Sequence, residues 1–215
     1  MTSGRRRLII CSTAMGSAAV LLYFMPLFHV VPLEVAGQRS VAATFDPVAF
    51  VDSFWTERLL PSADRAVDVA TLVAAVREDR QAAKRAHGRS VGLGGVYYYF
   101  VAGTGRVVAV EKNSVGLAVL DGEQQVQVAL ETGNIFGNTL RDGTGLLDVN
   151  DIANSQDFNA LSSEINGRIE REVLPSLRSM AVTGATIRFV GCAEIVDEDT
   201  DLQPLRIVPF IAETP

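Results

Sequence analysis

An uninterrupted apolar segment near the N-terminus constrains this chain more than any other feature. Residues 8–33 (LIICSTAMGSAAVLLYFMPLFHVVPL) contain no Lys, Arg, Asp or Glu. As a helix rising about 1.5 Å per residue, the segment is longer than the roughly 30 Å hydrocarbon core of a bilayer. Three arginines at residues 5–7 precede it, and the first carboxylate, Glu34, follows it. Because basic residues beside a span stay cytoplasmic, we expect the N-terminus inside and residues 34–215 outside the cytoplasmic membrane.

Three interpretations of this segment differ in how the chain is held. An uncleaved signal anchor fits its length, since the apolar core of a cleaved signal peptide has only about 7–15 residues. Cleavage would take place at residues 35–37 (VAG), but Pro32 and Leu33, shortly before them, make this a poor cleavage site. Lipidation needs a small residue before a Cys that follows the apolar core, whereas Cys11 follows Ile10 at the start of that core. The sequence favours a single-pass transmembrane helix and leaves cleavage and lipidation open.

The rest of the chain is acidic. Three of the 19 Lys and Arg residues precede residue 34 and all 25 Asp and Glu residues follow residue 33, so residues 34–215 carry a formal charge of −9. Without a basic stripe, such a chain is a poor partner for nucleic acid. We expect no disulfide, because Cys11 lies in the apolar segment and Cys192 far downstream, where it should be a small buried residue.

Local patterns predict an α+β protein: residues 1–33 as cytoplasmic stub and anchor, 34–45 as linker and 46–215 as one extracytoplasmic domain. Residues 46–88 should be helical, with one helix from Asp46-Pro47 to Pro61 and a second ending near Ala86. Trp55 lies on the apolar side of the first helix and should be buried against the barrel.

Residues 91–215 should be rich in strands. The expected strands are 91–101, 106–112, 115–120, 125–130, 187–196 and 205–211. A turn is expected at residues 103–105 (GTG), an irregular loop over 133–156, and a helix over 155–182 that Asn154 or Ser155 caps and Pro175 breaks or kinks. Pro209 suggests an edge position for the last strand. This order matches a small antiparallel OB-like β-barrel with an inserted helix.

Most motifs of enzyme chemistry are missing from the sequence. His29 lies in the apolar segment and His87 at a helix end, which leaves no His for a catalytic triad or a multi-His zinc site. No nucleophile elbow, Walker loop or Cys pair at ligand spacing occurs. We therefore predict no catalytic residue, no metal and no cofactor, and a carboxylate-based hydrolase is the weakest alternative.

The densest set of polar residues lies in the long loop. It comprises Asn138, Arg141, Asp142, Asp148, Asn150 and Asp151. One hypothesis is a ligand site, in which Arg141 and Asp142 bind the hydroxyls of a sugar and Asp148 to Asp151 offer oxygens to Ca²⁺, without the Gly and Glu of an EF-hand. The favoured interpretation is local: turns, a helix cap and an Arg–Asp pair that hold the loop.

An aromatic run, residues 97–100 (YYYF), is a second possible site. Strand alternation places Tyr97 and Tyr99 on one face, and Tyr98 and Phe100 on the other. One face could stack on a sugar, but core packing is the expected role of both.

Several segments resemble a bacterial family of uncharacterised predicted periplasmic lipoproteins. They are residues 97–110 (YYYFVAGTGRVVAV), 137–142 (GNTLRD), 146–178, 184–195 (GATIRFVGCAEI) and 205–213 (LRIVPFIAE). The resemblance implies a gene neighbourhood with sugar-type ABC transporter components and brings no catalytic residue. The chain departs from the lipoprotein pattern at Cys11. We therefore expect a non-enzymatic, membrane-anchored accessory protein, or alternatively a sugar- or Ca²⁺-binding module that uses loop 138–154.

Overall fold

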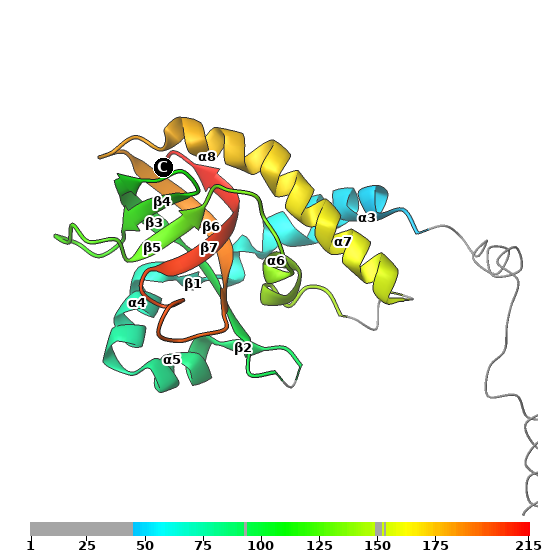
Figure 1. The fold of residues 1–215 in the computed structure, drawn as a ribbon, viewed down its shortest axis with the longest axis horizontal. Coiled ribbons are helices and arrows are strands. Elements are labelled where there is room, and N and C mark those ends of the chain that lie inside the picture. Colours follow the sequence, from blue (N-terminus) through cyan, green and yellow to red (C-terminus); the bar gives the residue numbers. More distant parts are fainter. Residues whose placement is uncertain (1–44, 93, 149–151, 153) are drawn as a thin grey trace, which may run out of the picture. The chain divides into compact units, whose positions relative to one another are not determined.

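Five strands pair in a closed ring in this computed structural model, which describes residues 45–92, 94–148, 152 and 154–215 (Figure 1). The strands are β3 (Tyr97–Val110), β4 (Ser114–Ala118), β5 (Val128–Glu131), β6 (Thr186–Ile195) and β7 (Leu205–Glu213). They pair in the order β3-β4-β5-β7-β6, and β6 returns to β3. Because β5 and β7 run parallel, the sheet is mixed, and the expectation of a wholly antiparallel sheet was wrong.

Strand β3 is one continuous element, so the turn predicted at residues 103–105 is wrong. Residues 97–106 of β3 pair with β6, and residues 106–110 pair with β4. The two glycines serve close packing instead of a turn. A Cβ on Gly103 would lie 2.4 Å from Cγ1 of Val69, and one on Gly105 would lie 2.9 Å from Cβ of Leu117. The long strand can therefore pair with β6 along one part of its length and with β4 along the other, which closes the ring.

The first helical segment begins where predicted and ends later. In α3 (Pro47–Phe54), the carboxylate of Asp46 accepts hydrogen bonds from the backbone N–H groups of Val48 (3.0 Å) and Ala49 (3.1 Å). The helical path continues through a π turn, η1 (Trp55–Leu59), and a 3₁₀ turn, η2 (Leu60–Arg65). Pro61 does not end it, because a residue at the start of a new turn needs no N–H donor.

The second predicted helix is two helices, α4 (Val69–Glu78) and α5 (Arg80–His87). Asp79 separates them with extended backbone, and its carboxylate caps α5 at the N–H groups of Gln81 (2.9 Å) and Ala82 (3.0 Å). Two short strands, β1 (Val67–Asp68) and β2 (Arg89–Ser90), flank this pair and join β3.

The C-terminal helical run comprises α7 (Ser155–Arg168), the π segment η4 (Ile169–Val173) and α8 (Leu174–Met180). Asn154 caps it as predicted, accepting from the N–H of Asp157 at 2.8 Å. Pro175 lies in the first turn of α8, directly after η4. The helical path changes there from π to α geometry and does not break. Pro209 lies opposite Gly191 on β6, beyond the residues of β7 that pair with β5. At Pro209 the strand therefore pairs with β6 alone, as the edge prediction requires, although β7 as a whole has a neighbour on each side.

Helices cover the ring on different sides, with α4 and α5 away from α7 and α8 (Figure 1). Trp55 is buried and packs edge-on against Phe210 of β7, with ring centroids 6.3 Å apart. Cys192 is fully buried, which raises the pKa of its thiol. Tyr97, Tyr98 and Tyr99 are also buried, as core packing requires.

Several predictions lie outside the described residues: the anchor over residues 8–33, nearly all of the linker over 34–45, Asn150 and Asp151. The described residues from Asp46 onward form one compact unit. Within the described part of the chain, no helix combines the length and the apolar character that a bilayer crossing requires.

Candidate functional site

A short helix, α6 (Thr139–Gly143), lies inside the segment predicted to be an irregular loop. The backbone carbonyl of Asn138 accepts from the N–H of Asp142 at 2.9 Å, while the side chain of Asn138 makes no capping bond. At the other end, a Cβ on Gly143 would lie 2.9 Å from Sγ of Cys192. Only glycine therefore lets α6 approach strand β6 this closely, and this approach sets the position of Arg141 and Asp142.

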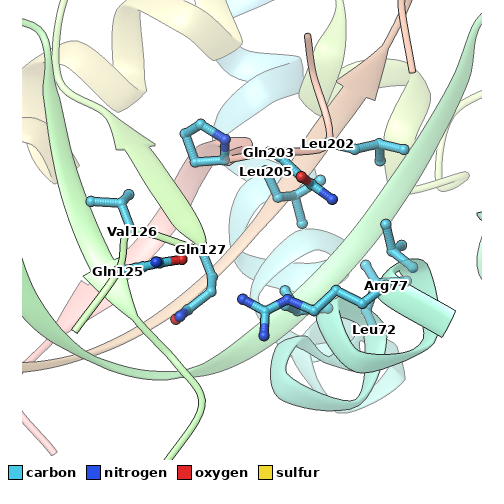
Figure 2. Close-up of a pocket in the computed structure, with 11 residues that line it drawn as sticks. Leu72, Arg77, Gln125, Val126, Gln127, Leu202, Gln203 and Leu205 are labelled. Atoms are coloured by element: carbon cyan, nitrogen blue, oxygen red, sulfur yellow. The ribbon is translucent and has the colours of Figure 1, made fainter. Parts of the chain in front are cut away.

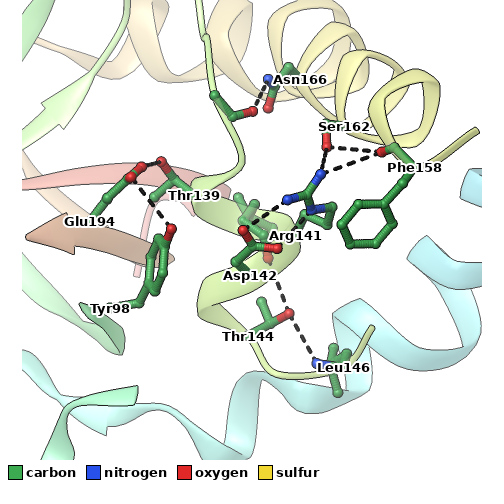
Figure 3. Close-up of polar contacts among 12 residues, drawn as sticks. Tyr98, Thr139, Arg141, Asp142, Thr144, Leu146, Phe158, Ser162, Asn166 and Glu194 are labelled. Carbon is green, nitrogen blue, oxygen red and sulfur yellow. Dashed lines mark hydrogen bonds and ion pairs between the residues drawn. The ribbon is translucent and has the colours of Figure 1, made fainter. Parts of the chain in front are cut away.

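Arg141 is buried, and each nitrogen of its guanidinium donates at least one hydrogen bond (Figure 3). Nε and Nη2 donate to the two carboxylate oxygens of Asp142 at 2.7 and 2.9 Å, and Nη1 donates to Oγ of Ser162 at 2.8 Å. The guanidinium carbon lies 3.7 Å from the ring centroid of Phe158. These contacts join α6 to α7, which is the local role that the sequence favoured.

Three of the predicted ligand-binding residues share a recess, called here the arginine recess. Its lining includes Arg89, Arg141, Asp142, Asp148 and Phe158. The Nε of Arg89 donates to the backbone carbonyl of Asp142 at 3.2 Å. Binding of a ligand by these residues stays a prediction, and Asn138 does not belong to this group. Across the described residues, no cluster of three or more His, Cys, Asp or Glu side chains is placed to hold a metal ion.

Asn138 instead borders a second recess, called here the Phe136 recess. Its lining includes Phe136, Asn138, Asn159, Ser163, Asn166 and Glu170. The aromatic residue is 79% exposed. The sequence did not predict a role for Phe136, because a single Phe in a loop has no periodic pattern. The glycine that follows it, Gly137, was the one available hint of a turn.

A carboxylate lies on the opposite side of α6 from Arg141. Glu194 of β6 accepts from Oγ1 of Thr139 at 2.8 Å and from the hydroxyl of Tyr98 at 3.4 Å (Figure 3). Burial, reinforced by the charge of Glu194, raises the pKa of Tyr98 to about 12. Glu194 also borders a third recess, together with Phe136 and Val196, which is 70% exposed.

Comparison with known proteins identifies the family. A family model described as "Predicted periplasmic lipoprotein (DUF2291)" matches residues 18–213. The chain belongs to this family. The resemblance drawn from the sequence is thereby confirmed, and no curated protein matches the chain.

The structure of this family member is similar to that of an OB-fold protein from Thermotoga maritima. The TM-score is 0.70 at 22% sequence identity, over 80% of this chain and 99% of that chain. This likeness concerns the fold alone. It agrees with the ring order of strands β3 to β7 and with a helix between the third and fourth of them.

A further cavity, of about 180 Å³, lies between α4 and residues 202–205 (Figure 2). Arg77 reaches across it toward Gln127 and pairs with both carboxylate oxygens of Glu123, at 2.6 and 3.0 Å. This pairing lowers the pKa of Glu123. Gln127 also bonds to Glu123 and accepts from the N–H of Val119 at 2.8 Å. The polar side chains at the rim of this cavity thus bond mainly to one another.

Proposed function

We propose that this chain is a non-enzymatic extracytoplasmic accessory protein, held at the cytoplasmic membrane by a single-pass anchor and working beside a sugar-type ABC uptake system. Membership of a predicted periplasmic lipoprotein family supports an extracytoplasmic place. The apolar residues 8–33, preceded by three arginines, support the anchor and an N-terminus inside. The transporter context comes from the family resemblance in the sequence.

One observation carries the non-enzymatic part of this proposal: the closed contacts of Arg141. Four of its five N–H groups bond to Asp142, Ser162 and the backbone carbonyl of Phe158, and the ring of Phe158 covers one face of the guanidinium. A general acid or base, or an electrophilic arginine, has to reach the reacting atoms of a substrate. Arg141 and Asp142 instead hold α6 against α7.

Cross-linking in native membranes tests the transporter association. We expect the tagged full chain, purified after cross-linking, to bring down transporter subunits. The matched control replaces residues 1–33 with a cleavable signal peptide, so that the same folded unit is exported without an anchor. We expect it in the soluble periplasmic fraction, with the transporter signal reduced. Recovery of the native chain from the cytosol, or purification without any transporter component, would contradict the proposal.

The arginine recess favours one second candidate, a small-ligand module that uses loop 138–154. Arg141, Asp142 and Asp148 border the same hollow, where carboxylate oxygens could accept from sugar hydroxyls or approach Ca²⁺. Calorimetry with pentoses, hexoses and Ca²⁺ tests it, with Asp148→Asn as the variant that should weaken binding. Absence of heat across that panel, with an unchanged melting temperature, would remove this candidate.

A further inference from the structure

The feature that carries a further inference is the exposed ring of Phe136. At 79% exposure, it is the most exposed of the large apolar side chains among the described residues. Single exposed apolar residues are common on protein surfaces and need no explanation by themselves. The backbone on both sides of Phe136 sets it apart.

The loop that carries Phe136 is held by side chains from the C-terminal helical run. Oε1 of Glu170 accepts from the N–H of Ile135 at 2.7 Å, and Nδ2 of Asn166 donates to the carbonyl of Gly137 at 2.9 Å. Gly137 has a φ of +81°, a conformation that favours glycine. The ring is therefore presented by a backbone fastened immediately before and after it, which lowers the ordering cost of binding.

The recess beside the ring has the chemistry of a binder for neutral, hydroxyl-rich molecules. Asn138, Asn159, Ser163 and Asn166 supply amides and hydroxyls, groups that both donate and accept hydrogen bonds. The hydroxyl of Ser163 already donates to the carbonyl of Asn159 and so offers its oxygen as an acceptor, and the amide of Asn166 keeps one N–H and its oxygen beside the bond to Gly137. Glu170 is the single charged residue of this lining, and one of its oxygens already accepts from the loop. No basic side chain lines the recess to attract phosphate, and one partly engaged carboxylate is a poor cation site.

The volume of the Phe136 recess, about 390 Å³, falls within the range of small-molecule sites in proteins. An aromatic face next to planar amides matches a ligand with one apolar face and a rim of hydroxyls. A sugar ring in a pyranose or furanose form has this shape.

We infer that the Phe136 recess binds a mono- or disaccharide, with an apolar face of the sugar stacked on Phe136 and its hydroxyls bonded to the asparagine and serine side chains. The inference rests on the proposed function for its setting beside a sugar uptake system and names the ligand class. It places the ligand apart from the arginine recess, whose lining shares no residue with that of the Phe136 recess.

Direct binding to the full chain tests this inference. The protein is solubilised in a detergent without a sugar headgroup and titrated with D-glucose, D-galactose, D-xylose, D-ribose and maltose by calorimetry. Saturation-transfer NMR then reports which sugar protons lie against an aromatic ring. We expect saturable binding of at least one sugar, weakened at least tenfold by Phe136→Ala and retained within about threefold by Phe136→Trp, since stacking needs the ring.

Val182→Ala provides the matched control. It removes another strongly exposed apolar side chain, which borders neither the Phe136 recess nor the third recess that Phe136 shares with Val196, so sugar affinity should be unchanged. Equal melting temperatures of all variants show that folding is intact. No saturable binding of any of the five sugars, or equal affinity of Phe136→Ala and the native chain, would overturn the inference. A native chain that binds no sugar yet loses cross-linked transporter on Phe136→Ala would also overturn it, while leaving the proposed function standing.

Discussion

Replacing Arg141 with methionine tests whether the polar loop is held by its own side chains. The substitution removes the guanidinium, which bonds to both oxygens of Asp142 and to Ser162 and stacks on Phe158, and keeps an unbranched side chain. The remaining carboxylate is only 14% exposed. Breaking a buried ion pair from one side costs about 3–5 kcal/mol. Because some water reaches Asp142, we expect the lower end, a loss of about 3 kcal/mol in the free energy of unfolding.

Urea denaturation followed by the fluorescence of Trp55, the single tryptophan of the chain, measures this loss. The control is Arg171→Met, because Arg171 is 59% exposed and its pair with Glu164 should contribute less than about 1 kcal/mol. Adding Asp142→Leu to Arg141→Met should recover part of the stability, since no carboxylate is left unpaired. A loss below about 1 kcal/mol for Arg141→Met would refute the structural role and leave Arg141 available for a ligand.

Two further predictions concern the strand β3. Gly103→Ala should cost about 1–3 kcal/mol, because its Cβ would lie 2.4 Å from Cγ1 of Val69, whereas Gly94→Ala, with no atom within 4 Å, should stay within about 0.5 kcal/mol; equal melting temperatures would contradict this. The pKa of Tyr98 is raised to about 12, so the folded state favours the neutral phenol over the phenolate. The contribution of this preference to the free energy of unfolding is fully present below pH 10, the ordinary pKa, and is lost as the pH rises from 10 to 12. The tyrosinate absorbance of Tyr98, measured as the difference between the native chain and Tyr98→Phe, should therefore rise together with unfolding, because the other three tyrosines contribute to both chains. A difference that appears near pH 10 without unfolding would be the opposing result.

Local signals in the sequence were reliable where the interaction itself is local. Asp46 and Asn154 cap helices through bonds to N–H groups two or three residues away, so neighbouring residues suffice to predict them. The OB-like arrangement was expected from the order of the elements along the chain, and the ring agrees with it once the predicted strands 91–101 and 106–112 are counted as the single strand β3.

Predictions failed where distant packing overrides a local preference. The glycines 103 and 105 suggest a turn by themselves, but inside β3 they admit Val69 and Leu117 at close range. Pro209 suggests an edge strand, which holds at Pro209 itself, but residues 205–207 of the same strand pair with β5 and give β7 a second neighbour. Neither partner is near in sequence, and so neither could be inferred from composition or periodicity.

The amino-acid sequence by itself determined the apolar N-terminal segment, the acidic charge of residues 34–215, the division into an early helical part and a later part rich in strands, and the gathering of polar residues in one segment. Only the tertiary structure decided what these polar residues do. Arg141 donates a hydrogen bond to Ser162, 21 residues away, and the N–H of Ile135 donates one to Glu170, 35 residues away. The second of these bonds helps to present Phe136 to solvent. The physical reason is that hydrogen bonds and stacking act over a few ångströms in space, whereas sequence patterns report neighbours along the chain.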